Sequence, residues 1–76
     1  MKELLTYIAQ SLVDHPEQVE VNEYAGDGET TLELRVAADD MGKVIGRQGR
    51  IAKWIRVLVR SVGQRKGTRV SVEISD

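Results

Sequence analysis

The chain has 76 residues, of which 41% are hydrophobic and 30% charged, and its formal net charge is −1. A chain of this length buries only about 60% of its unfolded surface, so we expect one domain over residues 1–76 with one modest core. The absence of cysteine excludes disulfides and thiolate metal sites. No segment has the roughly 20 apolar residues of a membrane helix or the apolar centre of a signal peptide, which predicts a cytoplasmic protein.

The charges are distributed unevenly along the chain. Residues 43–69 contain nine basic residues and no acid, and all twelve acids lie outside this stretch. The net charge therefore averages an acidic first half and a basic second half. The nine basic residues are Lys43, Arg47, Arg50, Lys53, Arg56, Arg60, Arg65, Lys66 and Arg69. We look for the function in this basic stretch.

The first half of the chain predicts one helix and a hairpin. Apolar residues at helical spacing indicate a helix over about residues 2–14, and the only proline then interrupts the pattern. Alternating apolar and polar residues predict strands around residues 19–22 and 32–36. Two glycines within residues 25–28 can adopt positive φ, which indicates a turn and an antiparallel hairpin.

Residues 39–45 predict a short helical turn. Asp39 or Asp40 can cap its first amides, and Gly46 ends it. Capping explains these adjacent carboxylates without a role in acid-base chemistry.

A longer helix is predicted from residue 49 to residue 62, with Gly63 as its stop. Its apolar row consists of Ile51, Ile55, Leu58 and Val62. Alternation over residues 70–74 predicts a third strand. The order α-β-β-α-α-β, with one sheet face to cover, predicts a two-layer α+β fold with a three-stranded mixed sheet and three helices on one face.

The loop Gly46-Arg47-Gln48-Gly49 joins the two predicted helices. Its glycines let the backbone approach a ligand closely, and the following helix N-terminus favours an anion. The alternative is an ordinary helix-helix turn. The basic stretch favours a polyanion, because its cations have no acid nearby in the sequence with which to pair.

The segment Val44-Ile45-Gly46-Arg47-Gln48-Gly49, followed by Lys53 and Ile55, resembles the signature of the KH domain. The element order resembles the type II arrangement of that fold, and residues 42–50 resemble the small bacterial single-KH RNA-binding proteins called KhpA. One position departs from the signature: Ala52 stands where the family pattern has isoleucine, and Ile51 comes one place earlier. The length suggests a stand-alone domain.

The resemblance implies a clamp that holds about four nucleotides of single-stranded RNA, as expected of an RNA chaperone or post-transcriptional regulator. The implied RNA-binding residues are Lys43, Ile45, Gly46, Arg47, Gln48, Gly49, Arg50 and Lys53. Ile45, Ala52 and Val36 are expected to line the groove that receives the bases.

Trp54 lies off the apolar row, on the same flank as Val57. It either packs at the edge of the core or forms, with Val57 and Ser61, a surface for a second copy or another protein. The resemblance implies self-association or pairing with a second KH-containing protein. An adaptor without a nucleic-acid role is therefore the alternative function.

The sequence argues against an enzyme. Its only histidine is His15, and it has no cysteine. The glycine loop matches neither the Walker nor the dinucleotide-binding pattern. We therefore expect no catalytic residues, no metal and no cofactor.

Overall fold

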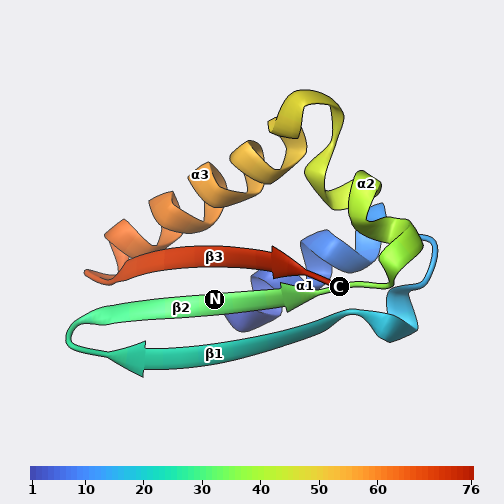
Figure 1. Ribbon diagram of the computed structural model, residues 1–76. Helices are drawn as coiled ribbons and strands as arrows, with labels where there is room; N and C mark the ends of the chain where they lie inside the picture. The colour runs from blue at the N-terminus through green and yellow to red at the C-terminus, as the bar shows by residue number, and fades with distance from the viewer.

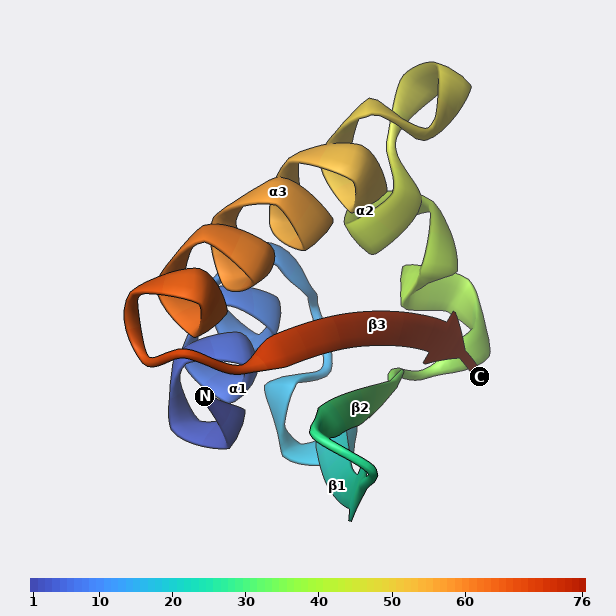
Figure 2. The same ribbon diagram turned by 90° about the vertical axis from the view of Figure 1, so that its left-hand side faces the viewer.

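The computed structural model describes residues 1–76. Its helices are α1 (Lys2–Leu12), α2 (Met41–Ile45) and α3 (Arg50–Arg65), and its strands are β1 (Glu20–Gly26), β2 (Glu29–Arg35) and β3 (Arg69–Ser75). The three helices cover one face of a three-stranded sheet (Figures 1 and 2). The predicted α-β-β-α-α-β order is confirmed. None of these helices combines the length and the apolar character needed to cross a membrane.

The sheet is mixed, as predicted, with strand order β1-β2-β3. β1 and β2 are antiparallel, and their last pair is Gly26 with Glu29. The two residues between them, Asp27 and Gly28, have φ of 48° and 76°. Two successive positive φ angles are typical of a tight hairpin turn that matches the strand twist. β3 then lies parallel to β2 as the other edge strand.

The core lies between the sheet and the helices. It is formed by Leu5, Ala9, Val21, Leu32, Leu34, Val36, Val44, Ile55, Val59, Val70 and Val72. Every strand and every helix contributes to it, and each fully buried aliphatic side chain stabilises the fold by about 1.5–3 kcal/mol relative to exposure. The short helix α2 is therefore stabilised by the packing of its own core residue, Val44, and not by the hydrogen bonds of a long helix.

The buried line of α3 differs from the predicted apolar row. The residues that α3 buries are Ala52, Ile55, Val59 and Gly63. Of the predicted row only Ile55 is fully buried, and Ile51, Leu58 and Val62 are half-buried. The prediction followed the largest side chains, whereas close packing against the sheet places small residues on the innermost line.

Gly63 does not end α3, which continues to Arg65. A Cβ at Gly63 would lie 2.6 Å from Cγ2 of Val70 and 3.0 Å from the carbonyl oxygen of Thr68. The glycine is therefore needed for the close approach of the helix to β3. The turn that follows the helix uses Gly67 instead, with φ of 73°.

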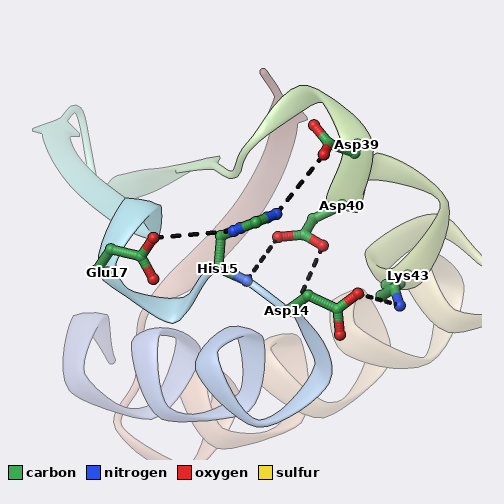
Figure 3. Close-up of polar contacts among 6 residues, drawn as sticks. All are labelled: Asp14, His15, Glu17, Asp39, Asp40 and Lys43. Carbon is green, nitrogen blue, oxygen red and sulfur yellow. Dashed lines mark hydrogen bonds and ion pairs between the residues drawn. The ribbon is translucent and has the colours of Figure 1, made fainter.

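Asp40 joins the end of α1 to the start of α2 (Figure 3). The backbone N–H groups of Asp14 and His15 donate to its two carboxylate oxygens, at 3.1 and 3.0 Å. The Asp40 side chain is 1% exposed and makes no capping bond to α2. The predicted capping role is thus wrong for Asp40. Because these amides bond to a carboxylate rather than to helical carbonyls, α1 ends at Leu12 instead of residue 14.

We predict that Asp40→Ala lowers the free energy of unfolding by about 2 kcal/mol, since it leaves two amides without their charged acceptor. Urea denaturation followed by circular dichroism measures the change. Asp39→Ala is the matched control, because the exposed Asp39 carboxylate makes only an ion pair with His15 at 3.6 Å. The control should stay within about 0.5 kcal/mol of wild type. Equal stability of the two variants would contradict the role given to Asp40.

Candidate nucleic-acid interface

The G-x-x-G loop, residues 46–49, stands at the end of the molecule away from the sheet (Figure 1). Gly46 and Gly49 have φ of 75° and 72°, and Gln48 between them has φ of 58°. The N–H of Gly49 donates to the carbonyl oxygen of Gly46 at 3.1 Å. Three positive φ angles in four residues fold the loop into a compact bend.

Two features require a glycine at position 46: its positive φ and its close contact with a neighbouring side chain. A Cβ there would lie 2.6 Å from Cγ1 of Ile51, whereas a Cβ at Gly49 would meet nothing within 4 Å. The loop backbone thus rests directly on the Ile51 side chain. Ala52, the departure from the family signature, is 5% exposed on the buried face of α3.

The loop exposes its polar side chains and leads into an uncapped helix. Arg47 and Gln48 are exposed. Gly49 is the N-cap of α3, and no side chain caps the first amides of that helix. The N–H of Arg50 already donates to the carbonyl oxygen of Arg47, so the amides that follow it, at the positive end of the helix dipole, are the ones left for an anion.

The cations of the basic stretch are almost entirely free of carboxylates. Among the nine, only Lys43 forms an ion pair, with Asp14 at 2.7 Å. Two arginines make other contacts: Arg50 donates to Oε1 of Gln48, and Nε of Arg56 donates to the carbonyl oxygen of Val72 on β3, both at 3.3 Å. The positive charge of α3 is therefore not neutralised by the acidic half of the chain.

Asp14 was not expected at this site, because it lies far from Lys43 in the sequence and no local pattern connects them. A hydrogen bond from Lys43, together with the attraction of its charge, lowers the pKa of Asp14 and raises the pKa of Lys43. Both side chains are largely exposed, so the pair is a weak one that water and salt screen. A phosphate can compete with Asp14 for the ammonium group.

We predict that the Asp14 carboxyl titrates below its ordinary pKa of 3.8 in wild type and returns toward that value in Lys43→Gln. Because the folded-state pKa is depressed, the pair is present at neutral pH and is lost as the pH falls through that pKa. NMR titration of the side-chain carboxyl resonance measures both. The exposed Glu29 carboxylate, which makes no ion pair, is the internal control. An unchanged Asp14 titration in Lys43→Gln would show that the pair does not form in solution.

The structure corrects part of the predicted base groove. Val36 and Ala52 are buried, with 4% and 5% exposure, so they cannot contact a base in this conformation. Ile45 is half-buried beside the loop and keeps a partly accessible side chain. Of the three predicted groove residues, Ile45 alone can take part.

Trp54 is exposed rather than packed at the core edge. Its exposed fraction is 68%, and that of Val57 is 51%. Ser61, one turn further along α3, is exposed too. The structure therefore brings Trp54, Val57 and Ser61 onto one open flank of the helix.

A cationic G-x-x-G loop between two helices, on an α-β-β-α-α-β chain with this mixed sheet, defines a KH domain of the type II arrangement. A solved structure shares the fold: that of an Era variant from Aquifex aeolicus bound to GDP and AlF4−, with a TM-score of 0.67 and 21% identity. The match covers 96% of this chain and 28% of the Era chain. At this identity the likeness concerns the fold alone.

Sequence comparison identifies the family. The profile described as "KhpA/KhpB, KH domain" matches residues 2–74. The RNA-binding protein KhpA of Clostridium perfringens is 55% identical over 97% of this chain and 99% of its own length. KhpA of Chlamydia pneumoniae is 49% identical over 100% of this chain and 97% of its own. The chain belongs to the KhpA/KhpB KH-domain family, which is not a family of enzymes.

Proposed function

We propose that this protein binds single-stranded RNA by holding its sugar-phosphate backbone at the G-x-x-G loop. One observation carries the proposal: a compact loop with exposed side chains opens a helix N-terminus that has no side-chain cap, and of the cations near it only Lys43 has a carboxylate partner. The similar proteins from Clostridium and Chlamydia are named RNA-binding proteins, which supports the same assignment.

Each residue of the site has a distinct part in this proposal. Gly46 and Gly49 let the backbone approach the strand, and the first amides of α3 donate to a phosphate. Arg47, Arg50 and Lys53 supply positive charge around it. Lys43 joins them when a phosphate replaces Asp14, and Ile45 offers an apolar contact to one base.

The number of phosphate contacts determines the affinity for RNA. A site for about four nucleotides with about three phosphate contacts gives weak binding with a log-log salt slope of roughly −2. Weak, sequence-tolerant binding that releases readily suits an RNA chaperone or a post-transcriptional regulator, and we propose that role in the cytoplasm.

We predict that Arg47→Asp combined with Gln48→Asp lowers the affinity for a short single-stranded RNA by more than about tenfold, because it places two acids where phosphates bind. NMR titration at two salt concentrations measures the affinity and its salt slope, and circular dichroism verifies the fold.

The control for this variant is Lys2→Asp with Gln18→Asp, which changes the net charge equally. Both control positions are exposed. Lys2 also lies away from the loop, because its neighbour Met1 lines a hollow with Gly63 and Lys66 at the other end of α3. RNA binding that survives the loop variant, or falls equally in the control, would end the proposal that the loop holds the strand.

The exposed flank of α3 favours a second candidate function, a protein contact with another copy or with a second KH-containing protein. An exposed tryptophan and valine on adjacent turns form an apolar strip whose exposure to water is unfavourable. As an adaptor the protein would act through this strip, with or without RNA.

We predict that Val57→Glu lowers the mass measured by light scattering at high protein concentration, because a buried unpaired carboxylate opposes association. Trp54→Glu should act in the same direction. Gln64→Glu, an exposed change further along α3, should leave the mass unchanged. A wild-type protein that is monomeric at high concentration would exclude self-association.

A further inference from the structure

An apolar hollow of about 600 Å³ lies between α1 and α3. One aromatic side chain from each helix lines it, Tyr7 from α1 and Trp54 from α3, with exposed fractions of 71% and 68%. We call this hollow the aromatic groove. Successive helix residues are about 100° apart, so Lys53 and Arg60 lie on a different flank of α3 from Trp54. The groove thus lies on a different flank of α3 from Lys53 and Arg60.

The aromatic groove is continuous with the G-x-x-G loop. Ile51 lines the groove and also carries the backbone of Gly46, whose added Cβ would be 2.6 Å from Cγ1 of Ile51. Arg50 lines it too, and its guanidinium donates to Oε1 of Gln48 in the loop at 3.3 Å. A strand held at the loop therefore passes directly beside the groove.

The residues that line the groove indicate which kind of ligand it can hold. Arg50 is the only charged residue of the lining, and no acid contributes to it. Exposed aromatic faces, an apolar floor and one guanidinium match a base joined to a phosphate. The volume is that of a small-molecule site, whereas a second protein copy needs about 800 Å² of contact on each partner.

We propose that the aromatic groove binds one base of the RNA strand that the loop holds, stacked on the indole of Trp54, with Arg50 at the adjoining phosphate. This inference rests on the proposed function and extends it. The strand then crosses the N-terminus of α3, with the loop contacting its backbone and the groove receiving the next base. Stacking on an aromatic side chain tolerates any base, so the groove adds affinity without strict sequence preference.

The fluorescence of Trp54 tests this directly, because it is the only tryptophan in the chain. Titration of wild type with a single-stranded RNA of about eight nucleotides should quench the emission, and a strand of about four should quench it less. Trp54→Ala should weaken binding of the longer strand by roughly tenfold, and Trp54→Phe should restore most of the loss. Gln64→Ala is the control, since Gln64 is exposed on the same helix but does not line the groove.

The possible results separate this inference from the proposed function. If Arg47→Asp with Gln48→Asp abolishes RNA binding while Trp54 emission is unchanged by RNA and Trp54→Ala binds normally, the groove proposal is overturned and the loop proposal stands. Emission that depends on protein concentration and not on RNA would place the indole between two copies and would also overturn it. Absence of RNA binding by the wild-type protein would overturn both.

Discussion

The placement of the loop depends on α3 being held at both ends by contacts that only glycine allows. At the C-terminal end, Gly63 brings the helix backbone against Val70 of β3. At the N-terminal end, the backbone of Gly46 rests on Ile51. A side chain at either position would push the helix or the loop away. The bend that precedes α3 is therefore a fixed shape, and its amides are oriented before any ligand arrives.

The distribution of charge follows from this architecture. The acids of β1 and β2 lie on the hairpin, and an acid of this region pairs within it, as Glu33 does with Arg35 at 3.6 Å. None of the cations of α3 forms an ion pair, and the one acid that reaches the basic stretch, Asp14, pairs with Lys43 on α2. A chain with a formal charge of −1 thus carries a locally positive surface, and whole-chain charge gives no guide to what that surface attracts.

The sequence was a good guide wherever a feature is local. Alternation located the strands, and Gly46 ends α2 as predicted. The segment 25–28 holds the hairpin turn, although Asp27 and Gly28, rather than the two glycines, take positive φ. Errors arose where contacts between distant segments decide the outcome. The apolar row of α3 was rotated, and Gly63 was assigned to a helix end, because the sequence does not show how closely the helix approaches β3. The bond from Asp40 to the end of α1 spans too many residues for any local pattern to reveal.

The candidate site also has a part that the sequence predicts and a part that it does not. Its loop was predictable, because a G-x-x-G segment and a helix start are read from consecutive residues. Its surroundings were not, because the burial of Val36 and Ala52 and the exposure of Tyr7 result from packing.

This division bears on specificity. In the proposed function, main-chain amides and arginines at the loop contact the phosphate, a feature that every strand shares, and such contacts do not distinguish one base from another. With two of the three predicted groove residues buried, the proposed function leaves Ile45 and the side chains that line the hollow between α1 and α3 as the groups that could select among bases. Those are apolar and aromatic surfaces with few hydrogen-bonding groups, which discriminate by stacking strength rather than by base edges. The proposed site therefore predicts a protein that prefers flexible, unpaired RNA over any particular sequence.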